Sequence, residues 1–193
     1  MRRAALAEPL AVAMHGVARA GDLQGQRVLV SGAGPIGLLT LVAARAAGAA
    51  TVDISDVLDG PLERARQLGA DEVINVAESQ LKVSAYDVVL ECSGAPVAIS
   101  AALAAARPAG TVVQVGMVPN EPRPVNLAPY IAKELRLLGT FRFKDEITAA
   151  VKLLAADPGI ESVITHEFSL EEAEGAFAAA RDSQASGKVV LKL

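Results

Sequence analysis

Residues 31–37 read Ser-Gly-Ala-Gly-Pro-Ile-Gly and contain the pattern G-x-G-x-x-G. The apolar run Arg27 to Ser31 (RVLVS) precedes them, and an Ala/Leu-rich stretch from Pro35 to about Ala47 follows. The first run predicts a strand, and the second predicts a helix that is apolar on nearly all sides and is therefore buried. The glycine pattern alone is weak, but a strand, a glycine turn and a helix in this order are typical of a loop that binds a dinucleotide.

The three glycines of this loop would each have a physical task. Gly32 permits the tight turn, Gly34 lets the backbone approach a pyrophosphate, and Gly37 lets the helix pack closely on the strand. The N–H groups of the first helical turn, Ile36 among them, would point at the phosphates, and the helix dipole would add to that attraction. The arrangement predicts a pyrophosphate site.

Two other interpretations of the loop stay open. The first is that the glycines form a turn with a structural role alone. The second is a methyltransferase, which uses a similar loop but usually has an acidic residue just before the first glycine, where this chain has Val30 and Ser31. That difference makes a methyltransferase the weaker interpretation.

A dinucleotide loop of this kind needs an acidic residue at the end of the second strand to bind the adenosine ribose. The second strand is predicted at Thr51 to Ser55, and Asp56 follows it, 19 residues beyond Gly37. Asp53 falls inside the strand, so Asp56 is the better candidate. A carboxylate accepts hydrogen bonds from free ribose hydroxyls and repels a 2′-phosphate, which favours NAD over NADP. The alternative is that Asp56 is a solvated loop residue.

The rest of the chain alternates β-branched runs with helical stretches. Strands are expected at residues 72–76, 86–91, 111–115, 135–143 and 189–193, and helices at 8–20, at 61–68, after Pro96, at 144–156 and at 169–181. The last helix begins at a capping box formed by Ser169 and Glu172, and the proline-rich residues 120–129 are expected to form a loop. Strand runs without polar alternation, joined by helices, indicate a parallel sheet covered on both faces, the doubly wound α/β (Rossmann) fold.

The composition limits what else the chain can be. Of its 193 residues, 52% are hydrophobic and 21% charged, and 22 acidic against 18 basic residues give a net charge of −4. These values describe a mildly acidic, soluble chain of single-domain length, and they argue against nucleic acid or an anionic membrane as the main partner. Cys92 is the only cysteine, which excludes an internal disulfide or a metal site of several thiolates and favours the cytoplasm. The only histidines, His15 and His166, are interpreted as packing or surface residues.

Six blocks of sequence, which occur in a fixed order along the chain, point further. They are AEPLAVAMHGV (7–17), VLVSGAGPIGLL (28–39), ARQLGADEVINV (65–76), YDVVLECSGAP (86–96), GTVVQVGM (110–117) and GTFRF (139–143). Together they resemble the medium-chain dehydrogenase/reductase family of zinc-dependent alcohol dehydrogenases, and most of all its polyol branch of sorbitol and L-idonate 5-dehydrogenases. Members of this family carry an N-terminal GroES-like catalytic domain with the zinc ligands. The resemblance implies that this chain is the cofactor-binding half and that the catalytic domain is absent from it.

The resemblance also implies which residues contact the cofactor, NAD. They are Gly32, Gly34, Pro35, Ile36 and Gly37 for the pyrophosphate, Asp56 for the ribose, Cys92, Ser93 and Gly94 after the fourth strand, Val115, Gly116 and Met117 beside the nicotinamide, and Phe141, Arg142 and Phe143 at the nicotinamide end. All lie at or just past the carboxyl ends of predicted strands, where open α/β sheets bind ligands. Cys92 has no neighbouring base and is expected to line the cleft rather than act as a nucleophile.

Two residues would face the catalytic site of the complete enzyme. By resemblance, Glu8 lies beside the catalytic zinc, as an extra ligand or a partner of its water, and Arg142 pairs with it and orients the substrate. Many relatives have a cysteine directly before that glutamate, whereas this chain has Ala7, which weakens a direct role with zinc. The alternatives are an acidic residue stabilised by the dipole of the first helix for Glu8, and an ordinary ion pair for Arg142.

The resemblance implies a reaction in which a polyol or a sugar acid such as idonate passes a hydride to the nicotinamide while zinc polarises the alcohol oxygen. It also implies three parts: residues 1–26 as an interdomain helix and lead-in, 27–143 as the dinucleotide-binding domain, and 144–193 as helices and a strand that return toward the catalytic domain. The edge strand 135–143 would form a homodimer. This chain alone is expected to bind NAD with little or no turnover. The alternative is a non-catalytic nucleotide-binding or interaction module.

Overall fold

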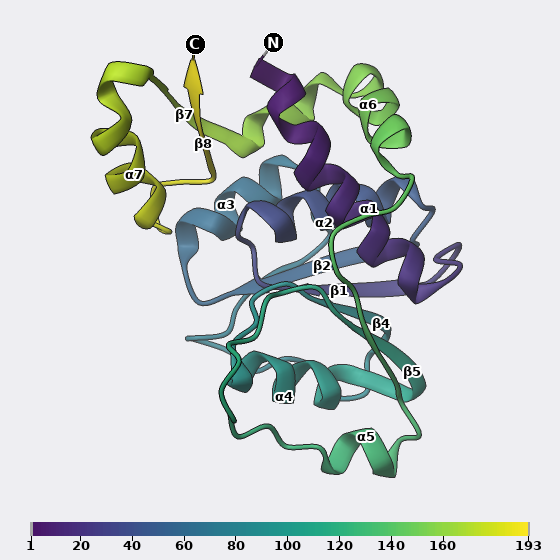
Figure 1. The fold of residues 1–193 in the computed structure, drawn as a ribbon. Coiled ribbons are helices and arrows are strands. Elements are labelled where there is room, and N and C mark those ends of the chain that lie inside the picture. The colour runs from purple at the N-terminus through teal and green to yellow at the C-terminus, as the bar shows by residue number, and fades with distance from the viewer. Residues whose placement is uncertain (1, 193) are drawn as a thin grey trace.

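Six parallel strands form the centre of the molecule (Figure 1). Their order in the sheet is β3-β2-β1-β4-β5-β6. The computed structural model describes residues 2–192. The strands are β1 (Arg27–Ser31), β2 (Thr51–Asp56), β3 (Val73–Asn75), β4 (Tyr86–Glu91), β5 (Ala106–Gln114) and β6 (Arg136–Gly139). Every neighbouring pair in the sheet is parallel. The predicted doubly wound parallel sheet is therefore confirmed.

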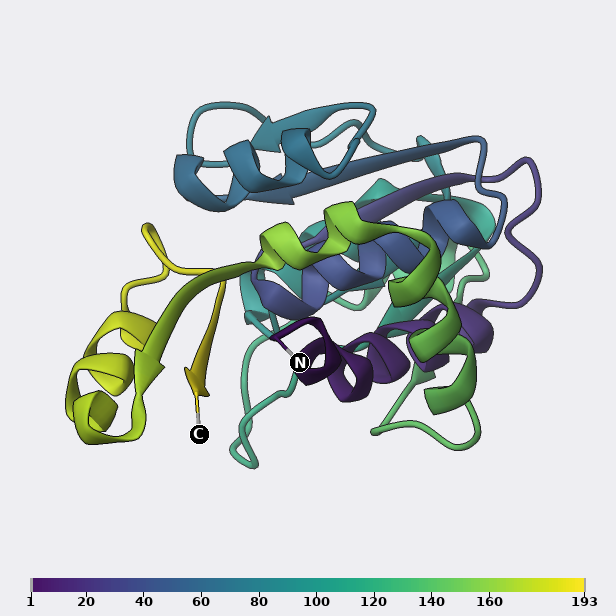
Figure 2. The same ribbon diagram turned by 90° about the horizontal axis from the view of Figure 1, so that it is seen from above.

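Helices cover both faces of this sheet, as the views in Figures 1 and 2 show. On one face lie α1 (Ala7–Ala20), α2 (Pro35–Ala46), α3 (Asp59–Gln67) and α6 (Ile147–Ala156), and on the other lie α4 (Pro96–Ala105) and α5 (Ala128–Ala132). Within residues 2–192 the longest helix, α1, has 14 residues, and no helix combines the length and apolar character of a membrane span.

Strand β1 explains why the strands of this sheet are apolar at nearly every position. Val28 and Val30 are fully buried in a cluster with residues of α1 and α2, whereas Leu29 is fully buried in a second cluster with residues of α4. Side chains alternate between the two faces of a strand, so a strand with helices on both faces needs apolar residues throughout. The carboxyl ends of these buried strands are left as the edge where polar groups and ligands can gather.

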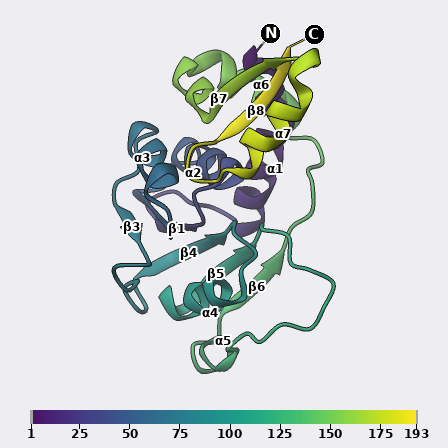
Figure 3. The ribbon, with the colours of Figure 1, turned by 90° about the vertical axis from the view of Figure 1, so that its left-hand side faces the viewer.

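A smaller unit at the C-terminal end lies on the side of the sheet that α1, α2, α3 and α6 cover (Figure 3). It consists of β7 (Ile164–Ser169), α7 (Ala173–Arg181) and β8 (Lys188–Lys192), and its two strands are parallel to each other. The predicted capping box is present, because Glu172 Oε2 accepts a hydrogen bond from the Ser169 N–H at 3.0 Å. The closing strand was expected to reach Leu193, which lies outside the described residues.

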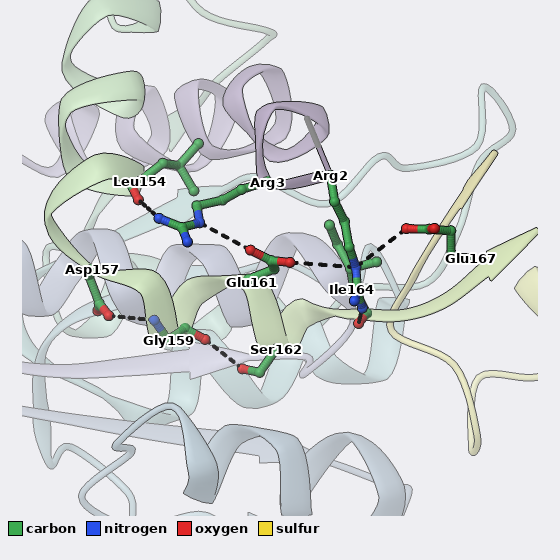
Figure 4. Close-up of polar contacts among 9 residues, drawn as sticks. All are labelled: Arg2, Arg3, Leu154, Asp157, Gly159, Glu161, Ser162, Ile164 and Glu167. Carbon is green, nitrogen blue, oxygen red and sulfur yellow. Dashed lines mark hydrogen bonds and ion pairs between the residues drawn. The ribbon is translucent and has the colours of Figure 1, made fainter. Parts of the chain in front are cut away.

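The first turn of the chain is anchored to the segment that leads into β7 (Figure 4). Residues Arg2–Leu6 form a 3-10 helix, and Arg3 donates to Glu161 Oε2 at 3.1 Å and to the carbonyl of Leu154 at 3.0 Å. Arg2 donates to the carbonyl of Ile164 at 2.8 Å. Because these side chains are about one-third to two-fifths exposed, each ion pair contributes little stability, but together they place the start of the chain beside its C-terminal third.

Of the two alternatives for His15, a packing or a surface residue, the structure shows the first. It is 8% exposed, and its Nδ1 lies 2.7 Å from Oε1 of Glu146, the residue before α6. Burial raises the pKa of Glu146, but the hydrogen bonds from the His15 ring and the Lys144 N–H outweigh it, so the pKa is lowered. The pair joins α1 to the start of α6. His166 contacts Thr165 Oγ1 at 2.8 Å and stacks on Phe168.

The structure corrects several predicted limits. The strand predicted at 111–115 is longer at its start and ends one residue earlier, because β5 spans Ala106–Gln114 and bulges between the pairs Tyr86–Ala106 and Val88–Thr111. The strand predicted at 135–143 is present only at Arg136–Gly139, and the end of the predicted range is not extended, since Arg142 has a φ of +56°. The expected loop 120–129 overlaps α5, which begins at Ala128. The other predicted elements are present with ends shifted by a few residues.

Candidate cofactor site

The glycine loop after β1 has the tight turn that its sequence predicts. Gly32 has a φ of +98°, a conformation that favours glycine, and its N–H donates to the carbonyl of Ser55 at 2.7 Å. A Cβ at Gly32 would lie 2.9 Å from the backbone nitrogen of Ser93. The loop therefore connects the ends of β1, β2 and β4 at one point.

The other two glycines of the loop differ in what surrounds them. A Cβ at Gly37 would overlap the carbonyl oxygen of Gly32 and lie 2.9 Å from its carbonyl carbon, so α2 packs directly on the turn. At Gly34, which precedes α2, a Cβ would meet nothing within 4 Å. The backbone at Gly34 thus borders open space, which lets a ligand approach the N–H groups at the start of α2.

Asp56 ends β2, and its carboxylate faces the glycine loop. Its Oδ2 accepts from the Ala33 N–H at 2.7 Å, and its Oδ1 accepts from the N–H groups of Val57 at 2.7 Å and Leu58 at 3.0 Å. Asp53 lies inside the strand, where it accepts a hydrogen bond from the Tyr86 hydroxyl at 3.0 Å and where burial raises its pKa. The strand-end position predicted for Asp56 is therefore confirmed.

Two adjoining cavities lie above this loop and share Gly32, Asp56 and Ser93. One, of about 340 Å³, has a floor of Gly32, Gly34, Pro35, Asp56, Cys92 and Ser93, and is also lined by Ala180, Ser183, Ser186 and Gly187. The other, of about 440 Å³, extends from Asp56 over apolar side chains that include Val57, Val76, Val83 and Val97. A cavity with a mixed polar and apolar lining at a helix N-terminus, which also includes Leu58 and Pro61, thus continues into a more apolar one.

Glu91, the last residue of β4, organises the turn that follows it and was not identified from the sequence. The side chain is fully buried, and its carboxylate accepts from the N–H groups of Ser93 and Gly94, both at 2.9 Å. It also accepts from the Ser93 hydroxyl and from Gln114 Nε2. An acidic residue directly after the apolar residues Val88–Leu90 is the signal in the sequence that marks such a position.

The turn after β5 packs backbone to backbone against the turn after β4. A Cβ at Gly116 would lie 2.7 Å from the carbonyl carbon of Cys92, and a Cβ at Gly94 would lie 3.0 Å from that of Met117. Gln114 Nε2 also donates to the carbonyl of Gly116 at 3.0 Å. The structure thus brings two predicted groups, 92–94 and 115–117, together, although Met117 is 76% exposed.

Cys92 has the properties of a lining residue. Its thiol donates to Thr40 Oγ1 at 3.6 Å, and burial raises its pKa to about 12. At neutral pH the thiol is therefore protonated and a poor nucleophile, in agreement with its predicted role in lining the cleft.

We expect iodoacetamide to alkylate Cys92 of the folded protein at pH 8 at least about 100-fold more slowly than in urea, because only the thiolate reacts. Mass spectrometry of the single cysteine at timed intervals measures both rates. Alkylation of the folded chain at the rate of glutathione would contradict a partly buried, protonated thiol.

The remaining predicted residues lie apart from these cavities. Glu8 is exposed in the first turn of α1, and among residues 2–192 no ion pair joins it to Arg142. Arg142 is exposed and lies over the ring of Phe141, 5.3 Å from its centroid. No group of three or more His, Cys, Asp or Glu side chains among the described residues is placed to hold a metal.

One set of lining residues had no signal in the sequence. Ala180, Ser183, Ser186 and Gly187 belong to the end of α7 and the loop before β8, more than 120 residues after Asp56. Nothing in their local pattern indicates a ligand, since only the packing of the C-terminal unit on α3 brings them to the pocket.

Comparison with known proteins gives a consistent result. A sequence model of the zinc-binding dehydrogenases matches residues 35–156. Sorbitol dehydrogenase from Bos taurus is 37% identical over 184 residues, which cover 90% of this chain and 51% of the bovine protein. The chain thus spans about half the length of the curated relatives it matches.

Solved structures share the fold. L-Idonate 5-dehydrogenase from Escherichia coli superposes with a TM-score of 0.92 at 35% identity, over 99% of this chain and 57% of that protein. A protein from Sinorhizobium meliloti, described as a zinc-binding dehydrogenase and bound to NADP, superposes with a TM-score of 0.88 at 30% identity, over 98% of this chain and 58% of its own. The similarity includes the C-terminal unit as well as the main sheet.

Proposed function

The chain belongs to the zinc-binding dehydrogenase family, and on that premise we propose that it is the NAD-binding domain of an alcohol dehydrogenase that acts on polyols or sugar acids. The observation that carries this proposal is the carboxylate of Asp56 beside a glycine loop with open space at Gly34. The names of the sorbitol and idonate dehydrogenases among the relatives support the substrate class.

The two cavities match the parts of a dinucleotide. The pyrophosphate would lie at Gly34 and the start of α2, where N–H groups and the helix dipole attract an anion. The adenine would lie among the valine side chains of the apolar cavity. The nicotinamide would extend toward the packed turns 92–94 and 115–117, with Phe141, Arg142 and Phe143 beyond them.

Asp56 supports NAD rather than NADP. Its two oxygens offer about four acceptor positions, of which backbone N–H groups occupy three, so one remains for a ribose hydroxyl. A 2′-phosphate at the same place would meet the negative charge of Asp56. One structural neighbour is bound to NADP, so the preference of this chain for NAD over NADP is to be tested at Asp56.

The bound nicotinamide would supply the acceptor for the hydride of a secondary alcohol. This chain's own residues would bind and orient the cofactor, and the close packing of the two turns would exclude water beneath it. The described residues contain no group of three or more His, Cys, Asp or Glu side chains that could hold a metal ion, and therefore do not fit a zinc site. We also propose a homodimer through β6, which lies at the edge of the sheet and exposes Leu137. The proposed location is the cytoplasm, and the proposed parts of the chain are residues 1–26, 27–143 and 144–193.

Replacing Asp56 with alanine is expected to weaken NADH binding by about tenfold or more, because a hydrogen bond to a charged acceptor is lost. NADPH should lose less affinity, because the repulsion of its 2′-phosphate is removed as well. Titration with each cofactor, followed by the fluorescence of the reduced nicotinamide, measures both constants.

Asp59→Asn is the matched control. Asp59 lies three residues further along, at the start of α3, and its carboxylate accepts from Asn75 at 2.8 Å. The Asp59→Asn substitution removes one negative charge close to Asp56 and should leave NADH binding unchanged. Absence of NADH binding by the unmodified chain, or equal affinity after Asp56→Ala, would refute the proposal. A loss of the same size for NADH and NADPH would refute the ribose role of Asp56.

A further inference from the structure

The wall of the smaller cavity opposite the glycine loop comes largely from the segment 182–187, which we call the C-terminal loop. Ser183, Ser186 and Gly187 line the cavity across from Gly34 and Pro35. The loop comes from the C-terminal unit, whereas the floor comes from the main sheet. Its position relative to the floor therefore depends on contacts between the two parts.

Arg64 of α3 makes such contacts. Its Nη1 donates to the carbonyls of Gln184 at 3.2 Å and Ala185 at 3.3 Å, and its Nη2 donates to those of Ser183 at 3.3 Å and Ser186 at 3.1 Å. Four consecutive carbonyl oxygens thus surround one guanidinium group. Charge-assisted hydrogen bonds of this kind are stronger than neutral ones, and the planar fork of arginine fixes their direction.

Among the described residues, the Arg64 guanidinium donates hydrogen bonds only to these four carbonyl oxygens. Its Nε is buried without a hydrogen-bond partner in residues 2–192. Burial lowers the pKa of Arg64, whereas the carboxylates of Asp56 and Asp182 raise it. Arg64 thus leaves one buried donor, Nε, unsatisfied while its other two nitrogens bind four carbonyl oxygens of the loop. The contacts with the loop therefore determine where the Arg64 side chain lies.

Gly60 provides a second, independent contact between α3 and the same loop. A Cβ at this position would overlap the carbonyl oxygen of Gln184 and lie 3.0 Å from its carbonyl carbon. Gly60 lies in the first turn of α3 and has an ordinary helical backbone, so glycine is needed here for space. The start of α3 therefore packs on the backbone of the C-terminal loop.

The loop keeps its own shape through internal hydrogen bonds. Asp182 Oδ1 accepts from the N–H groups of Gln184 and Ala185, both at 3.1 Å, and the Asp182 carbonyl accepts from the Ser186 N–H at 2.8 Å. The Ser186 hydroxyl donates to the carbonyl of Ala179 at 2.7 Å. The loop is thus a preformed unit, and α3 determines where it lies.

We propose that Arg64 is a positioning residue, which holds the C-terminal loop against α3 so that the diphosphate part of a dinucleotide is enclosed between this loop and the start of α2. This inference rests on the proposed function and adds a residue that would not touch the cofactor. A wall that is ordered before the ligand arrives improves affinity, because binding then carries no entropic cost of ordering the loop.

Three variants of α3 test the role of Arg64. Arg64→Met removes the four charge-assisted contacts, Arg64→Lys keeps the charge but not the fork, and Arg66→Met is the matched control. Arg66 lies on the same helix, is exposed, and donates to Glu63 at 2.9 Å. NADH affinity is expected to fall about tenfold in Arg64→Met, by less in Arg64→Lys, and not at all in Arg66→Met.

Hydrogen exchange gives a readout that a general loss of stability would not produce. In the unmodified chain and in Arg66→Met, saturating NADH should slow exchange of the amides of residues 183–187. In Arg64→Met, NADH at saturation should still protect the glycine loop but no longer protect residues 183–187. Thermal unfolding of each variant shows that the comparison is made on folded protein.

Gly60→Ala tests the same loop without removing Arg64. The added methyl group would displace the carbonyl of Gln184, so NADH affinity should fall as in Arg64→Met. If Arg64→Met does not fold, Gly60→Ala tests the position of the loop in its place. Unchanged NADH affinity in Arg64→Met or in Gly60→Ala would overturn the positioning role while leaving the proposed function intact. Failure of the unmodified chain to bind NADH would overturn both.

Discussion

Gly37→Ala is expected to lower the free energy of unfolding by about 3 kcal/mol and to abolish measurable NADH binding. A Cβ at Gly37 would overlap the carbonyl oxygen of Gly32, a backbone atom that cannot turn away as a flexible side chain can. To relieve the overlap, α2 must separate from the turn. The hydrogen bonds of the turn to Ser55 and Asp56 would then be strained, and these connect β1 to β2.

Gly34→Ala separates binding from stability in the same loop. A Cβ at Gly34 meets nothing within 4 Å and the φ there is −64°, so the variant should unfold at the same urea concentration as the unmodified chain. It should nevertheless bind NADH at least about tenfold more weakly, because the methyl group would occupy the space through which the pyrophosphate approaches.

Urea unfolding followed by circular dichroism, together with NADH titration, distinguishes the two glycines. The expected pattern is loss of both stability and binding for Gly37→Ala, and loss of binding alone for Gly34→Ala. If Gly37→Ala unfolds at the urea concentration of the unmodified chain, the close packing of α2 on the turn is wrong. If Gly34→Ala binds NADH normally, the pyrophosphate lies elsewhere.

The segment from β1 to α2 could be predicted nearly residue by residue because its signals are local. The apolar run of β1, three glycines and a proline at the first helical position each restrict the backbone within a few residues of themselves. The choice of Asp56 over Asp53 also followed from position in the strand, since only the strand end reaches the ligand edge of a parallel sheet.

The parts that were missed depend on contacts between distant residues. The first half of β5 contains Pro108 and Gly110 and is irregular: Ala106 pairs with Tyr86 of β4, and regular pairing resumes only at Thr111. The C-terminal loop reaches the pocket through Arg64, which its own residues do not reveal. Local pattern thus predicted the floor of the pocket but not its opposite wall.

Glu91 has a local signal in the sequence, but its role depends on distant contacts. Its position at the end of a strand could be predicted, whereas its hydrogen-bond partners could not. It ends the run YDVVLE just before the turn Cys92–Gly94, which was predicted to line the cleft. The structure shows that this turn and the turn after β5 are held by the Glu91 carboxylate through Ser93, Gly94 and Gln114. A fully buried acidic side chain is retained in a fold only when such partners surround it.

Glu91→Leu is expected to lower the free energy of unfolding by about 3 kcal/mol or more and to weaken NADH binding by at least about 100-fold. The leucine has similar volume but removes the acceptor of the Ser93 and Gly94 N–H groups. It also removes one of the two acceptors of the Gln114 amide, which keeps its hydrogen bond to the carbonyl of Gly116. Each such group costs about 1–3 kcal/mol, so the effect exceeds that of an ordinary core substitution. Urea unfolding and NADH titration measure the two losses.

Glu91→Gln and the exposed Glu174→Leu complete the argument by separating the acceptor from the residue type. Glutamine retains one acceptor oxygen, so Glu91→Gln should lose less stability than Glu91→Leu, and adding Gln114→Glu should recover part of it, because the amide introduced at position 91 can then donate to the new carboxylate. Glu174→Leu should leave both stability and NADH affinity unchanged. Equal stability of Glu91→Leu and the unmodified chain would show that the two turns are held by backbone packing alone. Loss of stability in Glu91→Leu with full NADH affinity would show that the turn after β4 does not shape the cofactor site.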